Sequence, residues 1–138
     1  MSSIIADSSG LISLLFPKDS NNKIAVKIGN FLVSSSSRII IPGDIFTEIV
    51  NIVGKKEGHS QAFQVGSRLI TSYLYEIIDV TKNLRDKAFM KFKKQPKSVS
   101  LTDCIVMAFA DEFETKEIFG FDEAFKKNGY IRIGIDEK

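Results

Sequence analysis

Cysteine and histidine are nearly absent from this sequence of 138 residues, which holds one of each. Cys104 alone cannot close an internal disulfide, and it cannot build a zinc site from several thiolates. His59, the single histidine, lies in a Gly-His-Ser stretch between two expected helices. A multi-histidine metal site is therefore excluded, and a catalytic triad would depend on that one loop residue. If this chain is an enzyme, we expect carboxylates and a metal ion to carry its chemistry.

Long apolar runs and a strong net charge are lacking as well. No uninterrupted apolar stretch approaches the roughly 18–20 residues that cross a membrane, and the first residues lack the basic-then-apolar pattern of a signal peptide. We therefore expect a cytoplasmic protein that has no membrane contact. Nineteen basic and seventeen acidic residues leave a formal net charge of +2, so bulk charge does not by itself indicate nucleic-acid binding.

What the chain does contain is typical of one globular domain. Hydrophobic residues make up 43% of the sequence and charged residues 26%, which is close to the average of folded proteins. A domain of this size buries roughly two thirds of the surface that its unfolded chain exposes. The sequence shows no internal repeat and no long linker. We therefore expect a single domain over residues 1–138.

Hydrophobic periodicity predicts strands that alternate with helices. Short runs rich in β-branched residues predict buried strands at residues 4–6, 38–41, 76–80, 117–119 and 131–133. Helical spacing predicts helices at residues 11–15, 22–34, 61–74, 82–94 and 122–127, one that opens at 42–44 and ends between Gly54 and Gly58, and a buried one that starts at Ser100. This order predicts an α/β fold of three layers, α/β/α, around a mainly parallel sheet.

Two acidic residues stand where such a fold places its binding crevice, just beyond the carboxyl ends of strands, and two more lie in helices. Asp7 and Asp122 follow the strands at 4–6 and near 117–119. Glu48 lies in the helix after the second strand, and Asp103 lies in the first turn of the buried helix. If the four met, the carboxylates would repel one another, and divalent cations would neutralise them most readily.

Each acid also has an ordinary structural explanation. Asp7, Asp103 and Asp122 stand at expected helix starts, where carboxylates cap free backbone N–H groups. Glu48 stands at the rim of an apolar helical stripe, a place where glutamate is usually structural. The residues alone leave both explanations open, and it is the order of the four acids along the chain that favours a joint site.

Four segments in that order resemble the motifs of the PIN domain family. Asp7 lies in the segment Ile-Ala-Asp-Ser-Ser-Gly, Glu48 in Asp-Ile-Phe-Thr-Glu-Ile-Val-Asn, Asp103 in Ser-Leu-Thr-Asp-Cys and Asp122 in Phe-Gly-Phe-Asp-Glu-Ala-Phe. The resemblance covers nearly the whole chain, whose length matches the stand-alone toxins of VapBC-type toxin–antitoxin modules. One departure is Gly120, because many members have Thr or Ser there, and a hydroxyl that would position metal or water is missing.

The resemblance implies a PIN-like, Rossmann-like fold and a metal-dependent endoribonuclease that cleaves single-stranded or looped RNA. Asp7, Glu48, Asp103 and Asp122 would hold Mg²⁺ or Mn²⁺, the first and third as direct ligands and the other two directly or through water. Hard oxygen ligands suit these ions, which lower the pKa of bound water and orient it for attack on phosphorus. The expected partners are an RNA substrate, a small antitoxin protein and a second copy in a homodimer.

Substrate contacts are expected beside the four acids. Lys91 and Lys94 belong to a lysine-rich helix that could contact phosphates, or could simply form a solvated face. Ser8 follows the first aspartate and could bind a phosphate or a metal-bound water, or could favour the helix start. Phe89 and Phe92 lie among the lysines, where an aromatic ring could stack on an RNA base, but we expect both to face the core.

Two other classes of function compete with the nuclease. A catalytically weak or inactive PIN-like module for RNA binding or assembly would share the fold, and Gly120 is the one sequence feature in its favour. A phosphate receiver or a haloacid-dehalogenase-like phosphatase would need paired acids after the first strand. Because Asp7 is followed by two serines, both of these are disfavoured.

Overall fold

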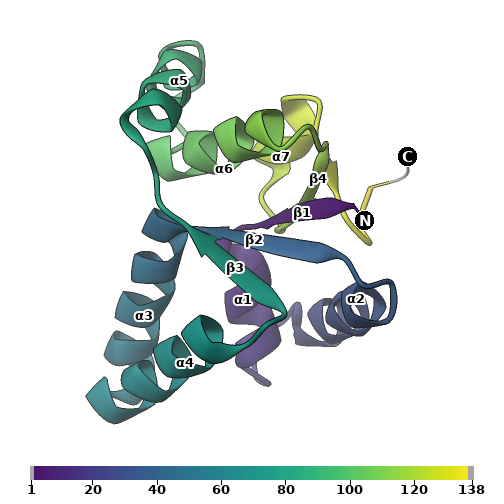
Figure 1. Ribbon diagram of the computed structural model, residues 1–138, viewed down its shortest axis with the longest axis vertical. Coiled ribbons are helices and arrows are strands. Elements are labelled where there is room, and N and C mark those ends of the chain that lie inside the picture. The colour runs from purple at the N-terminus through teal and green to yellow at the C-terminus, as the bar shows by residue number, and fades with distance from the viewer. Residues whose placement is uncertain (1, 137–138) are drawn as a thin grey trace.

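The computed structural model describes residues 2–136, so Met1 and residues 137–138 of the expected domain lie outside the described residues. Within them the chain forms five strands and seven helices (Figure 1). The strands are β1 (Ser3–Ala6), β2 (Arg38–Pro42), β3 (Tyr75–Ile78), β4 (Glu117–Phe119) and β5 (Ile131–Arg132). The helices are α1 (Ser8–Leu15), α2 (Asn22–Ser34), α3 (Gly43–Glu57), α4 (His59–Thr71), α5 (Lys82–Lys93), α6 (Leu101–Glu112) and α7 (Glu123–Lys127).

The strands form one sheet in the order β3-β2-β1-β4-β5, and every neighbouring pair is parallel. Helices α1 to α4 cover one face of this sheet and α5 to α7 cover the other (Figure 1). The three-layer α/β/α fold predicted from the sequence is therefore confirmed, with a sheet that is parallel throughout.

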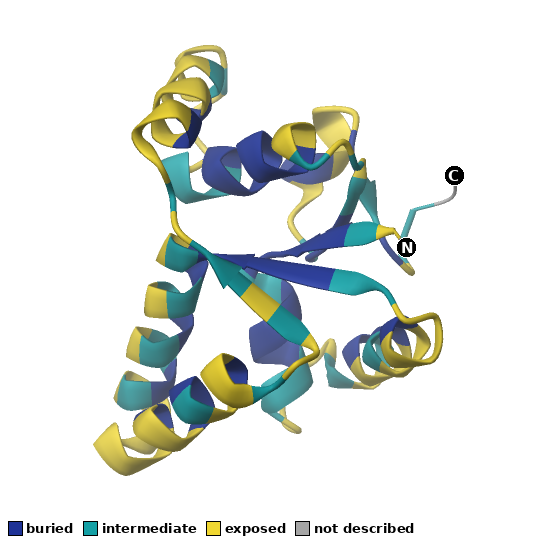
Figure 2. Cartoon of the chain, in the orientation of Figure 1, coloured by how far each residue is buried: buried dark blue, intermediate teal, exposed yellow. Residues whose placement is uncertain are grey.

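The core explains why these segments fold as they do. Ile5 in β1 and Ile40 in β2 are fully buried, as expected for β-branched residues in a strand covered on both faces (Figure 2). Helix α6 buries seven consecutive residues, 104–110, so it lies in the middle of its layer. Each large apolar side chain buried in this way stabilises the fold by roughly 1.5–3 kcal/mol. No helix among residues 2–136 is both long and apolar enough to cross a membrane.

Element boundaries differ from the predictions by a few residues, for identifiable reasons. Helix α1 starts at Ser8 rather than residue 11, because Asp7 caps it. Helix α4 ends at Thr71 rather than residue 74, because the backbone of Ser72 is extended and its hydroxyl accepts a hydrogen bond from the N–H of Leu74 at 3.1 Å. These side-chain caps favour the observed ends over a continued helix.

The direction of strand addition reverses at β1. The chain builds β1, β2 and β3 on one side and then returns to add β4 and β5 on the other side of β1. The backbone N–H of Asp7 donates to the carbonyl of Phe119 at 2.9 Å, so the carboxyl ends of β1 and β4 are joined. In open α/β sheets this reversal point is where ligands bind.

Candidate active site

Asp7 stands at the carboxyl end of β1 and is almost completely buried, with 4% of its surface exposed. Its Oδ2 accepts a hydrogen bond from the Ser9 hydroxyl at 2.6 Å and one from the Ser9 backbone N–H at 3.2 Å. The second bond caps helix α1. The structural explanation of Asp7 as a helix cap is therefore confirmed, and the residue also lies at the reversal point of the sheet.

Glu48 lies half-buried on α3 and faces the start of α1. Its Oε1 accepts a hydrogen bond from the Ser8 hydroxyl at 2.5 Å. This bond joins two helices that lie on the same face of the sheet. Ser8, predicted to contact phosphate or water, is thus the hydrogen-bond partner of Glu48 in this structure.

Asp103 and Asp122 also cap helices. Asp103 forms a reciprocal capping box with Ser100 at the start of α6, with both hydrogen bonds at 3.1 Å. Asp122 Oδ1 accepts from the Ala124 N–H at 2.9 Å at the start of α7. Within residues 2–136, the hydrogen bonds to each of the four acids use only one of its two carboxylate oxygens. The helix caps and the bond from Ser8 to Glu48 therefore leave the other carboxylate oxygen of each acid without a hydrogen bond.

Electrostatic interactions link the four acids. Burial raises the pKa of Asp7 to about 6, the charges of Asp103 and Glu48 add to this effect, and the Ser9 hydrogen bonds oppose it. Burial also raises the pKa of Asp103, helped by Asp122 and Glu48 and opposed by Ser100. None of the ion pairs formed by residues 2–136 includes any of the four acids. The carboxyl edge of the sheet therefore collects negative charge without a direct ion pair to any of the four acids among the described residues, although Asp122 interacts electrostatically with a nearby cation, Arg132.

The four carboxylates are ligands of the type that a hard divalent cation prefers, but they are not arranged as a complete coordination site. Among the described residues, no three carboxylate, imidazole or thiol groups stand close enough together to hold one ion. Carboxylate oxygens are nevertheless the ligands that Mg²⁺ and Mn²⁺ prefer, and a cation would relieve the repulsion that raises the pKa values of Asp7 and Asp103. Asp7, Glu48, Asp103 and Asp122 are the residues that would hold it.

Gly120 is required by packing rather than by backbone conformation. A Cβ atom at this position would lie 2.9 Å from the Cβ of Asp7 and 3.1 Å from Cε2 of Phe125. Such distances are shorter than normal van der Waals contacts, so a larger side chain would have to displace Asp7 or Phe125. The departure from the Thr or Ser pattern therefore accompanies a close approach between β4 and the buried aspartate.

The two predicted lysines lie on or next to α5, away from the buried aspartate. Lys91 forms an ion pair with Asp111 at 2.8 Å, and Asp111 is about two helical turns along α6 from Asp103. Lys94 is exposed at the end of α5. Their contact with substrate stays a prediction, and for Lys91 it would compete with an existing ion pair.

The expectation that Phe89 and Phe92 face the core is wrong. Their exposed fractions are 58% and 38%, and their rings stack on each other with centroids 6.2 Å apart. Helix α5 buries only Leu84 and Ala88, because it packs against α6 along a narrow face at the edge of its layer. The exposed side of α5 therefore carries aromatic rings as well as lysines.

A polar hollow of about 470 Å³ lies beside Glu48 and was not predicted from the sequence. Thr47, Asn51 and Lys55 line it from α3, and Thr102 lines it from α6. Residues at four-residue intervals lie on one face of a helix, so this spacing from 47 to 55 was a signal available in the sequence. The hollow extends the polar surface of the candidate site along α3.

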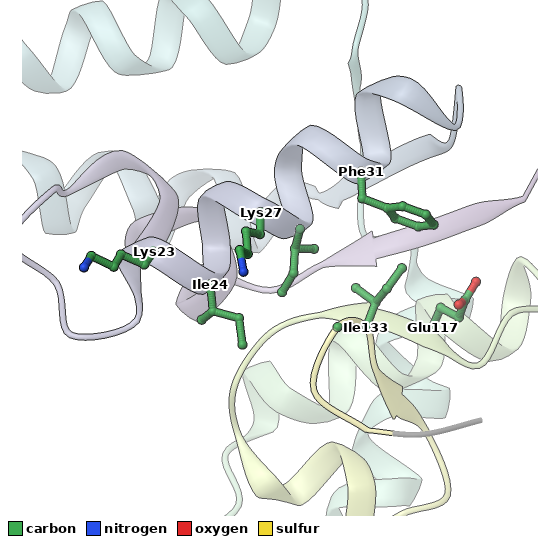
Figure 3. A pocket seen from close by; sticks show the side chains of 8 residues that line it. Lys23, Ile24, Lys27, Phe31, Glu117 and Ile133 are labelled. Carbon is green, nitrogen blue, oxygen red and sulfur yellow. The ribbon is translucent and has the colours of Figure 1, made fainter.

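A larger hollow, of about 700 Å³, lies elsewhere. Ile24 and Phe31 of α2 line it opposite Ile133, and Lys23 and Lys27 stand on the same helix (Figure 3). None of the predicted site residues lines this groove. The candidate active site is thus identified by its chemistry and its place in the sheet, not by cavity size.

Comparison with known proteins bears on the family and the fold. The family model of the PIN domain matches residues 4–129. The fold is similar to the crystal structure of VapC20 of Mycobacterium tuberculosis, described as a toxin that cleaves the sarcin–ricin loop, with a TM-score of 0.82. The two sequences are 17% identical, and the match covers 94% of this chain and 98% of that one. No curated protein matches the chain in sequence.

Proposed function

Because the chain belongs to the PIN domain family, we propose that it is a metal-dependent endoribonuclease and the toxin component of a toxin–antitoxin module. The observation that carries the proposal is the group of four electrostatically linked acids at the point where the sheet reverses. The fold similarity to a ribonuclease toxin supports it. Repulsion among neighbouring carboxylates destabilises a folded protein, and cation binding would compensate for that cost.

The side chains have distinct roles in the proposed reaction. Asp7, Glu48, Asp103 and Asp122 would bind Mg²⁺ or Mn²⁺, which would supply an activated water and stabilise charge on the leaving oxygen. Ser9 and Ser8 fix the orientations of Asp7 and Glu48 through their hydroxyl groups. With a pKa of about 6, Asp7 is largely ionised at neutral pH and ready to act as a ligand. The burial of Asp7 keeps bulk water from its carboxylate.

Substrate binding is proposed to involve α5 and Ser8. Lys94 and, after release from Asp111, Lys91 would contact phosphates, because lysines near an RNA strand gain affinity by releasing its counterions. The exposed rings of Phe89 and Phe92 support this placement, since unstacked RNA bases bind to aromatic faces. Ser8 would contribute through the water or phosphate next to Glu48.

The toxin role also brings protein partners. We propose a small antitoxin that covers the acidic edge and a homodimer of this chain. Among apolar residues of α2 and α3 that could lie either in a dimer interface or in the core, Leu32 and Val53 are core residues, whereas Phe31 is 56% exposed. Phe63 and Ile70 on α4 are exposed as well, at 71% and 64%. Light scattering of the purified chain tests the dimer, and the expected cytoplasmic location stays a prediction.

A catalytically weak or inactive RNA-binding module is the alternative, and one observation favours it. No three metal-ligating side chains of residues 2–136 stand close enough to share an ion. Gly120 gives this alternative less support than the sequence suggested, because the glycine is explained by its packing against Asp7.

Cleavage of a mixed panel of single-stranded and structured RNAs tests the proposal. The purified chain is assayed with Mg²⁺, Mn²⁺ or EDTA, beside Asp103→Asn and the control Asp86→Asn, whose carboxylate forms an exposed ion pair on α5. We expect metal-dependent cleavage that falls at least about a hundredfold in Asp103→Asn and is unchanged in Asp86→Asn. Circular dichroism checks that both variants fold. RNA binding without cleavage under every condition would favour the inactive module.

A further inference from the structure

The backbone of Phe121, the residue before Asp122, is held on both sides by side chains of other elements. The N–H of Phe121 donates to the hydroxyl of Ser9 on α1 at 2.9 Å. The carbonyl of the same residue accepts a hydrogen bond from Nη1 of Arg132 on β5 at 3.0 Å. Backbone groups of a loop are more often bonded to water, so this double attachment fixes the loop between β4 and α7.

Ser9 connects this loop to the buried aspartate. Its hydroxyl donates its one proton to Asp7 Oδ2 at 2.6 Å and accepts from the Phe121 N–H. The same side chain therefore orients the carboxylate of Asp7 and fixes the position of the residue before Asp122. A change at Ser9 would disturb two of the four acids together.

Arg132 is itself rigidly held. Its Nε and Nη2 donate to the two oxygens of Asp136 at 3.0 and 2.9 Å, and Asp136 also accepts from the Arg132 backbone N–H at 2.9 Å. The two side chains are only 12% and 7% exposed. Planar arginine–carboxylate pairs of this kind are directional, so the remaining nitrogen is aimed at the Phe121 carbonyl.

We propose that Arg132 and Ser9 are positioning residues that clamp the backbone of Phe121 and so hold Asp122 in place at the acidic edge of the sheet. The turn that carries Asp136 thereby becomes part of the support of the acidic site. The inference rests on the proposed function for its catalytic meaning, but the clamp itself is a property of the metal-free chain. It also gives a physical account of how the site is ordered although Gly120 has no side chain.

Two measurements on Arg132→Met, Arg132→Lys and Ser9→Ala test the clamp. The control is Arg38→Met, because Arg38 forms a comparable pair with Glu76, at 2.8 and 2.9 Å, on another part of the sheet. Amide hydrogen exchange without metal is expected to be at least about tenfold faster at residues 120–124 in Arg132→Met and Ser9→Ala, and unchanged there in Arg38→Met. Arg132→Lys should show an intermediate rate, since it keeps the charge without the planar geometry.

Calorimetric titration with Mn²⁺ alone gives the second readout. We expect Mn²⁺ affinity to fall about 10–100-fold in Arg132→Met and Ser9→Ala, and to stay within twofold in Arg38→Met. Unchanged exchange at residues 120–124 in folded Arg132→Met and Ser9→Ala would overturn the clamp, whatever the metal affinity. If the exchange results hold and the wild type neither binds Mn²⁺ nor cleaves RNA, the proposed function fails and the clamp stands as a structural device.

Discussion

The two ends of the sheet differ in whether their carboxylates form ion pairs. At the start of β2, Arg38 pairs with Glu76 of the neighbouring strand, and the two side chains are 37% and 50% exposed. At the carboxyl end, Asp7 is buried beside further acids, and no ion pair formed by the described residues includes it. The same fold can therefore provide an ion-pair partner for a carboxylate, and it provides none for Asp7 at the reversal point. This contrast favours a binding role for the acidic end over a purely structural one.

Removing a charge at the acidic end should have its largest effect on activity. Glu48→Gln keeps the size of the side chain and the bond from Ser8 but weakens the oxygen ligands, so we expect RNA cleavage to fall about a hundredfold or more. Glu57→Gln, an exposed change on the same helix, is the matched control and should cleave normally. Equal cleavage rates in the two variants would remove Glu48 from the site.

The negative charge of Asp7 should destabilise the fold when no metal is present. Burial raises the pKa of Asp7 from its ordinary value of 3.8, which we take for the unfolded chain, to about 6 in the folded chain. Between about pH 4 and pH 6 the unfolded chain has lost this proton while the folded chain keeps it, so stability falls as pH rises through that window. Asp7→Asn cannot ionise and still caps a helix, so we expect it to be more stable than wild type at pH 7 in EDTA, by roughly 2–3 kcal/mol.

Urea denaturation at several pH values in EDTA measures this difference. The gap between wild type and Asp7→Asn should open as pH rises from 4 to 6 and stay constant above it. Asp86→Asn serves as the control, because its carboxylate is exposed and paired with Lys82. A gap that does not depend on pH would show that the charge of Asp7 is not the cause.

Adding a side chain at Gly120, next to Asp7, should have a smaller effect than removing the charge of Glu48 or Asp7. Gly120→Thr would force atoms against Asp7 and Phe125, and we expect it to destabilise the fold by about 1–3 kcal/mol. Gly54→Ala is a suitable control, since its new Cβ would lie 3.6 Å from Ala62, an ordinary van der Waals contact. Chemical denaturation compares the two variants. If Gly120→Thr is as stable as wild type and cleaves faster, the glycine is not a packing requirement.

The smallest effect on activity and stability is expected from removing the Arg38–Glu76 ion pair at the start of β2. Arg38→Met removes an exposed ion pair, and such pairs contribute little to stability. We expect RNA cleavage within twofold of wild type and a thermal midpoint close to it. A large loss of cleavage in this variant would mean that the two ends of the sheet are not independent.

Local sequence patterns were sufficient to predict the elements of the fold. The runs Ile4–Ile5 and Ile39–Ile41 are β-branched and apolar, and they form buried strands because both faces of the sheet are covered. The order of the four acids was likewise readable, since it depends only on which strand or helix each residue follows. The structure adds that three of them, Asp7, Asp103 and Asp122, cap helices as well.

Contacts between segments far apart in the sequence could not be predicted in this way. Ser9 and Arg132 both bind the backbone of Phe121 only because β4 and β5 lie on the side of β1 opposite to β2. Phe89 was assigned to the core because helical periodicity does not reveal that α5 has a single packing neighbour over most of its length. Short-range patterns thus identify the candidate ligands, whereas the residues that position them follow from tertiary structure.

Proton release on Mn²⁺ binding tests whether Asp7 is part of a metal site. Titration calorimetry at pH 6, in two buffers of different ionisation enthalpy, gives the number of protons that leave the protein for each ion bound. Because the pKa of Asp7 is about 6, we expect roughly half a proton to be released from this carboxyl, and we expect Asp7→Asn to lose this release and to bind Mn²⁺ more weakly. Equal Mn²⁺ affinity and equal proton release in wild type and Asp7→Asn would contradict a metal site built on this buried aspartate.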